Sequence, residues 1–126
     1  MKARRITLLA LLLVTPFVAF AHGAKVGPNG GQVQEAGPYH FELVVGDRHV
    51  SVYVTDASAK PVATKGAKAT AIVLTNKKAV RISLSPAGEN ELKGRGSFVS
   101  ASDMKLVFSL ILAGKKPLMV RFASRK

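Results

Sequence analysis

Apolar and polar side chains alternate along two adjacent segments, residues 39–45 and 50–55, and this period of two constrains the fold more than any other feature. Such alternation is typical of β-strands with one buried face. A turn at Asp47-Arg48 predicts an antiparallel hairpin, because the apolar faces then coincide. The predicted partners are Val45 with Val50, Leu43 with Val52, Phe41 with Val54, Glu42 with Tyr53, and His40 with Thr55.

Other segments show similar patterns and predict further strands. They are residues 32–35, 69–75, 79–85, 91–93, 104–113 and 117–122. Residues 104–113 also fit a helix that begins at Asp103, but their apolar character on nearly all sides and the Gly114-Lys115 turn favour a strand. Seven or eight short strands without a helix predict an all-β fold, a small antiparallel β-sandwich of Ig-like or Greek-key type, with a small barrel as the alternative.

The first 21 residues have the three parts of a secretory signal peptide. Lys2, Arg4 and Arg5 precede an apolar run from Ile6 to Val14, Pro16 follows, and Ala19-Phe20-Ala21 supplies the small residues of a cleavage site. The run is shorter than the roughly 20 residues of a membrane-spanning helix. We therefore expect residues 1–21 to be cleaved and residues 22–126 to form one exported domain that does not span a membrane.

Composition narrows the classes of function. The chain has no cysteine, so thiolate metal sites and cysteine nucleophiles are excluded and burial alone must stabilise the fold. Loss of residues 1–21 leaves 16 basic and 7 acidic residues. Outside the cytoplasm such a balance favours anionic lipid head groups or envelope polymers over nucleic acid as partners, although a solvated basic surface is the common alternative. No catalytic motif is present, and we do not expect an enzyme.

Cleavage after Ala21 would make His22 the first residue of the mature chain. Its α-amine and imidazole Nδ1 can then close a chelate ring, and nitrogen ligands of this kind suit Cu(II). Cleavage after Ala19 would place His22 third, which is also a Cu(II)-chelating arrangement. The alternative is a frayed terminus without function.

His40 and Glu42 lie two residues apart on one predicted strand, so both project from the same face, about 6–7 Å apart. They could hold a divalent ion together with His22, or they could be polar residues on a solvent-facing surface. His49 lies near the opposite end of the hairpin, on the order of 20 Å from His40, and should not share that ion. Asp56 most simply begins a turn, and joining the site is its alternative role.

Three groups of residues form a recognisable set: Pro28-Asn29-Gly30-Gly31-Gln32-Val33, then Gly37 to Val45 with Tyr39-His40-Phe41-Glu42-Leu43 inside it, then Val52 to Asp56 with Lys60-Pro61-Val62. Together they resemble a small periplasmic β-domain that occurs alone and within adaptor subunits of heavy-metal efflux pumps. The resemblance implies a periplasmic β-sandwich associated with metal or copper resistance, and it points to His40, Glu42 and Asp56. The chain lacks the coiled-coil hairpin and lipoyl-like segment of a complete adaptor.

Two functions are therefore expected. The first is a periplasmic accessory protein that binds a divalent transition metal, copper above all, through His22 with His40, Glu42 and Asp56. The second is an interaction module, without metal, that docks on an efflux adaptor or an anionic envelope component. The soft sulfurs of Met104 and Met119 could bind Cu(I), but their apolar strands favour a place in the core.

Overall fold

A computed structural model of the protein describes residues 25–75 and 77–123. These residues form antiparallel strands and no helix, so the predicted all-β class is confirmed, and no helix in this part could cross a bilayer. The strands are β1 (Lys25–Val26), β2 (Gln32–Ala36), β3 (Tyr39–Gly46), β4 (His49–Asp56), β5 (Lys68–Thr75), β6 (Lys78–Pro86), β7 (Glu91–Arg95), β8 (Lys105–Ile111) and β9 (Leu118–Ala123). The predicted signal peptide, residues 1–21, and His22 lie outside the described residues.

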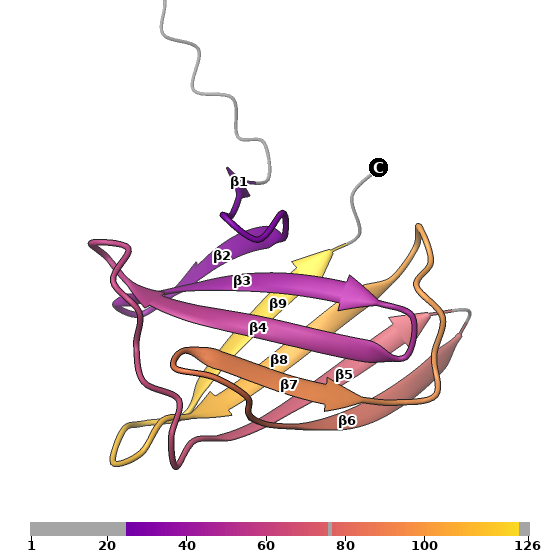
Figure 1. Ribbon diagram of the computed structural model, residues 1–126. Coiled ribbons are helices and arrows are strands. Elements are labelled where there is room, and N and C mark those ends of the chain that lie inside the picture. The colour runs from indigo at the N-terminus through magenta and orange to yellow at the C-terminus, as the bar shows by residue number, and fades with distance from the viewer. Residues whose placement is uncertain (1–24, 76, 124–126) are drawn as a thin grey trace, which may run out of the picture.

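The strands join in one sheet with the order β1-β2-β3-β4-β7-β6-β5-β8-β9. The sheet curls so that β1, β2, β3, β4 and β7 form a first wall, and β6, β5, β8 and β9 form a second wall behind it (Figure 1). β6 bridges the walls, because it pairs with β5 along its length and with β7 at Ser85 and Pro86. The spatial order β8-β5-β6-β7 is that of a Greek key. The finer assignment to an Ig-like sandwich stays a prediction.

The predicted hairpin is confirmed as β3 and β4, with all five predicted residue pairs in register. Its turn places Arg48 in the left-handed region, at φ 65°. Residues 105–111 form a strand, β8, which pairs with β9 across the Gly114-Lys115 turn as expected. The described residues contain nine strands, not seven or eight, because the two-residue strand β1 pairs with Gln32 and Val33. Two residues are too few to show a period in the sequence.

The core lies between the two walls. Strands β3 to β9 direct alternate side chains inward, and Phe41 of the first wall and Phe108 of the second, both fully buried, meet with their ring centroids 5.8 Å apart. Tyr39 packs edge-on against Phe41 at 6.2 Å. Since the chain has no disulfide, burial of this apolar set supplies the main stabilisation.

One expectation about the core was wrong. Met104 is 9% exposed and packs in the core, but Met119 is 60% exposed. Val120 and Phe122 occupy the inward positions of β9, so the alternation along the strand places Met119 on the outer surface.

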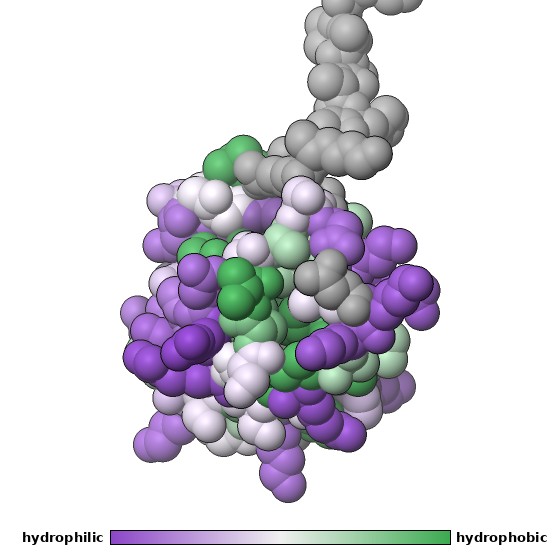
Figure 2. All heavy atoms as spheres, turned by 90° about the vertical axis from the view of Figure 1, so that its right-hand side faces the viewer, coloured by the Kyte–Doolittle hydropathy of each residue, from purple (hydrophilic) through white to green (hydrophobic). Residues whose placement is uncertain are grey.

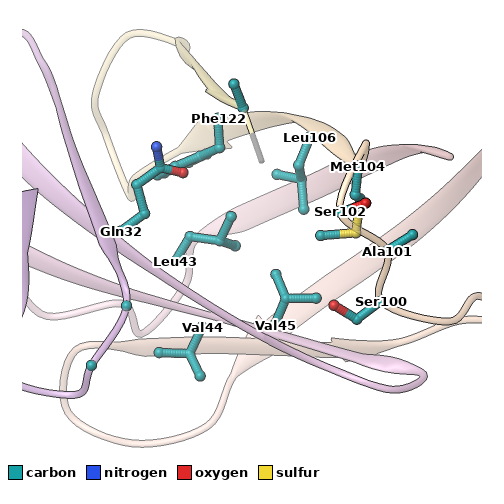
Figure 3. Close-up of a pocket in the computed structure, with 13 residues that line it drawn as sticks. Gln32, Leu43, Val44, Val45, Ser100, Ala101, Ser102, Met104, Leu106 and Phe122 are labelled. Carbon is teal, nitrogen blue, oxygen red and sulfur yellow. The ribbon is translucent and has the colours of Figure 1, made fainter. Parts of the chain in front are cut away.

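In the described part of the chain, the two walls do not pair with each other along the edge where β2 and β9 lie, which we call the seam. β2 lies beside β9, but no ladder of hydrogen bonds joins these two strands in the described residues. Near this seam a depression of about 470 Å³ separates β2 and β3 from β8, β9 and residues 100–104. Figure 3 shows apolar side chains directed into it from both sides, among them Leu43, Val45, Met104 and Leu106. The depression is thus the open end of the core.

Candidate functional site

Glu42 lies on the outer side of β3, yet its side chain is buried, with only 5% of the residue exposed. The loop between β1 and β2 covers it and donates four hydrogen-bond contacts to its carboxylate. The backbone N–H of Asn29 lies 2.9 Å from Oε2 and 3.3 Å from Oε1, the Asn29 side-chain amide donates to Oε1 at 3.0 Å, and the Gly31 N–H donates to Oε2 at 2.8 Å. A metal ion at Glu42 would have to displace these donors.

Two glycines allow the loop to approach this closely. A Cβ atom on Gly27 would lie 2.3 Å from Cδ of Glu42, and one on Gly31 would lie 2.3 Å from the carbonyl oxygen of Leu43. Both positions therefore exclude a larger residue. The glycine-rich segment and Glu42, two parts of the resemblance that lie apart in the sequence, form one structural unit.

Asp56 ends β4 and organises the turn that follows it. Its Oδ1 atom accepts hydrogen bonds from the N–H groups of Ser58 at 2.8 Å and Lys60 at 3.0 Å. The chain then returns to β4, where Pro61 bridges to Thr55. The predicted turn role of Asp56 accounts for these contacts.

His40 projects from the same outer face as Glu42, as the strand period predicted, and lies opposite Glu35 of β2. Its Nε2 atom is 3.4 Å from Oε1 of Glu35, and Nζ of Lys25 is 3.2 Å from the same oxygen. His49 lies at the other end of the hairpin, opposite Gly46. The structure thus groups His40 with Glu35 and Lys25, and separates it from His49.

The outer face of the first wall also places Tyr53 between Glu42 of β3 and Glu91 of β7. A hydrogen bond to Glu91 raises the pKa of Tyr53 to about 12, and partial burial and the negative charges of Glu91 and Glu42 act in the same direction. Tyr53 therefore stays a neutral hydrogen-bond donor at physiological pH. No group of three or more His, Asp or Glu residues suited to a metal ion occurs in the described part of the chain.

Charge is distributed very unevenly along the sequence. All seven acidic residues lie within residues 35–56 and 89–103, whereas residues 57–88 and 104–126 contain none and carry six lysines or arginines each. The fold brings these two acid-free segments together, because β5 and β6 come from the first and β8 and β9 from the second. The whole second wall is therefore built from strands without an acidic residue.

We define the acid-free face as the outward side chains of these four strands. Its central row runs across the wall as Arg81, Ile72, Val107 and Arg121, on β6, β5, β8 and β9 respectively. The row beside it contains Ala79, Leu74, Lys105 and Ala123, and the row on the other side contains Ser83, Thr70, Ser109 and Met119. At the usual strand spacing the two arginines stand about 14 Å apart, with aliphatic side chains between them.

Among the described residues, the bases of this face have no acidic partner. The ion pairs found among the described residues involve only Lys25, Glu35 and His40, all on the first wall. Acids occur at the margins of the face, since Asp103 precedes β8, Glu35 lies on β2 beside β9, and Glu91 lies on β7 beside β6. In the described part of the chain, no acid forms an ion pair with the positive charge of the face itself.

Exposed apolar groups gather on the same face. Six large hydrophobic residues are strongly exposed in the described chain, and four of them belong to it: Ile72 at 36%, Leu74 at 40%, Ile111 at 43% and Met119 at 60%. The other two are Val26 and Val99. In Figure 2, hydrophobic groups likewise lie among hydrophilic ones at the end of the molecule that carries the β5–β6 turn. The acid-free face is thus both basic and aliphatic.

Two depressions indent the acid-free face. One, of about 460 Å³, is lined by residues that include Leu74, Lys105, Val107 and Arg121. The other, of about 700 Å³, has hydroxyl groups of Thr70, Ser83 and Ser109 beside Lys68, Ile111 and Met119. Each combines cationic and apolar groups, which suits an amphipathic anion.

Comparison of the chain with protein-family models, with curated proteins and with solved structures found no match in any of the three. The resemblance to the efflux-associated β-domain stays a prediction. Function must therefore be argued from the geometry of this chain.

The geometry assigns Glu42 a structural role that can be tested. Replacement of Glu42 by Gln keeps the size of the side chain but turns an amide donor toward the N–H donors of Asn29 and Gly31. We expect a loss of about 1–3 kcal/mol in the free energy of unfolding, measured by urea denaturation. The amides of Asn29 and Gly31 should also exchange faster with solvent.

The control variant is Glu35→Gln, which changes the same group at an exposed position, where the effect should stay below about 1 kcal/mol. Equal stability losses in the two variants would contradict the structural role of Glu42.

Proposed function

We propose that this chain is a binding module, not an enzyme, that is exported to the periplasm after loss of residues 1–21 and docks on an anionic component of the envelope. The observation that carries the proposal is the acid-free face, where cationic side chains on four adjacent strands have no acidic partner among the residues that the structure describes. Clustered charge of one sign attracts a partner of the other sign and speeds the encounter. This proposal corresponds to the second of the two functions expected from the sequence, in which the partner is an efflux adaptor or an anionic envelope component.

The fold supports docking in a second way. The acid-free face lies on regular strands of a continuous sheet, so the backbone positions that carry its charges are fixed and the backbone gains little order on binding. The first wall differs, because its outer face carries Glu35, Glu42 and Glu91. Binding of an anion should therefore depend on which wall presents the charge, and not only on net charge.

Two double variants of equal net charge test this dependence. Arg81→Glu with Arg121→Glu alters the acid-free face, and Lys93→Glu with Arg95→Glu alters β7 of the first wall. Affinity for a fluorescent sulfated oligosaccharide, measured by anisotropy in low salt, should fall at least tenfold more in the first variant than in the second.

Thermal unfolding followed by circular dichroism would confirm that both variants are folded. Equal losses of affinity would mean that only net charge matters, and the docking proposal would then fail.

We also propose a metal-binding function as the second candidate, because one observation favours it. Glu35 lies 3.4 Å from His40 and 3.2 Å from Lys25, and His22 precedes Lys25 by three residues. Covalent geometry limits the distance between the Cα atoms of His22 and Lys25 to about 11 Å. The proposed ligands of a Cu(II) ion are therefore His22 with its amine, His40 and Glu35, with Glu35 in place of the hydrogen-bonded Glu42.

Titration of the processed protein with Cu(II), followed by electron paramagnetic resonance, tests this candidate. We expect a nitrogen-rich signal at one equivalent that His40→Ala alters and that a single residue added before His22 abolishes, while His49→Ala has no effect. Affinity no greater than that of a generic histidine-containing peptide would exclude the site.

A further inference from the structure

The acid-free face carries both cationic and aliphatic side chains. Four of its outward residues, Lys68, Arg81, Lys105 and Arg121, are cationic, and four others, Ile72, Leu74, Ile111 and Met119, are large, exposed and aliphatic. We propose that this face binds the surface of an anionic phospholipid bilayer, with the aliphatic side chains inserted at the head-group boundary and the cations on the lipid phosphates. This inference rests on the docking function proposed above and names its partner.

The arrangement of the rows supports a bilayer. Arg81 and Arg121 stand at the two ends of the central row, with Ile72 and Val107 between them. An aliphatic centre flanked by cations matches the layering of a lipid surface, where phosphates lie above acyl chains. Long arginine side chains can also extend to the phosphates while their stems rest on the apolar centre.

The composition of the face disfavours the other polyanions. Single-stranded nucleic acids bind to aromatic side chains on which bases stack, and the outward positions of β5, β6, β8 and β9 carry none. A hydrophilic polymer would gain nothing from contact with exposed Ile72 or Leu74. Burial of these aliphatic groups is favourable only in an apolar environment, which the acyl region of a bilayer supplies.

The depression of about 700 Å³ offers a place for one head group. Thr70, Ser83 and Ser109 bring hydroxyl groups to its lining, Lys68 adds a cation, and Ile111 and Met119 add apolar surface. Hydroxyl and ammonium groups donate hydrogen bonds to phosphate oxygens. A lipid phosphate here would place its acyl chains beside the aliphatic side chains of the same face.

Sedimentation of the processed protein with vesicles tests the inference. The probes are vesicles of phosphatidylcholine alone and of phosphatidylcholine with an equal amount of phosphatidylglycerol. We expect binding to the anionic vesicles only, and weaker binding as salt rises from about 0.05 to 0.5 M. A base at an anionic membrane raises the partition coefficient about fivefold, so Arg81→Glu with Arg121→Glu should lower it at least 25-fold.

The aliphatic contribution needs its own variant. Ile72→Ser with Leu74→Ser leaves every charge in place and should lower partitioning by about tenfold. The control is Val26→Ser with Val99→Ser, which changes two valines that are more exposed than Ile72 and Leu74 but lie away from the acid-free face, and it should have little effect. Unfolding curves of all variants establish that the fold is retained.

The outcomes separate this inference from the docking function on which it rests. If the charge variant weakens vesicle binding but Ile72→Ser with Leu74→Ser does not, the face docks on anions without insertion, and the bilayer inference is overturned while docking survives. If Arg81→Glu with Arg121→Glu binds vesicles and the sulfated oligosaccharide no worse than Lys93→Glu with Arg95→Glu, both proposals fail.

Discussion

The structure depends on filling the space between two walls of one curled sheet with alternate side chains from strands β3 to β9. No disulfide assists, so the inward positions must be apolar, and residues such as Phe41 and Phe108 occupy them completely. Strand geometry then fixes every outward side chain, because its neighbours in the chain point inward. Arg81, Ile72 and Arg121 face solvent for this reason. The acid-free face is thus a consequence of core packing combined with two long segments that contain no acid.

The first wall uses its outward positions differently. Glu42 receives hydrogen bonds from Asn29 and Gly31 and so fastens the loop that leads from β1 into β2. Asp56 fastens the turn after β4 in a similar way. The acids of the resemblance, Glu42 and Asp56, therefore have structural roles within the fold, and His40 pairs with Glu35 instead. Residues of the first wall thus hold loops in place, whereas outward residues of the second wall present positive charge to solvent.

Local patterns in the sequence predicted much of this fold. The register of β3 and β4 followed from matching apolar faces, and the Gly114-Lys115 turn correctly favoured a strand for β8 over a helix. Burial of Glu42 could not be predicted, because a loop more than ten residues earlier in the chain causes it. The acid-free segments are visible in the sequence, but their union on one face depends on β5 pairing with β8, a long-range contact that no local pattern specifies. Exposure of Met119 follows from the alternation of inward and outward side chains along β9. The sequence did not reveal this alternation, because the neighbours of Met119 are also apolar.

In the proposed binding mode the second wall, and not the first, meets an anionic lipid surface. Amide NMR spectra of the processed protein, recorded with anionic bicelles that contain a paramagnetic lipid, would distinguish the two walls. We expect line broadening to concentrate on residues of β5, β6, β8 and β9, with Ile72 and Val107 among the strongest. Broadening concentrated on β3 and β4, or the same weak effect over the whole surface, would contradict this binding mode.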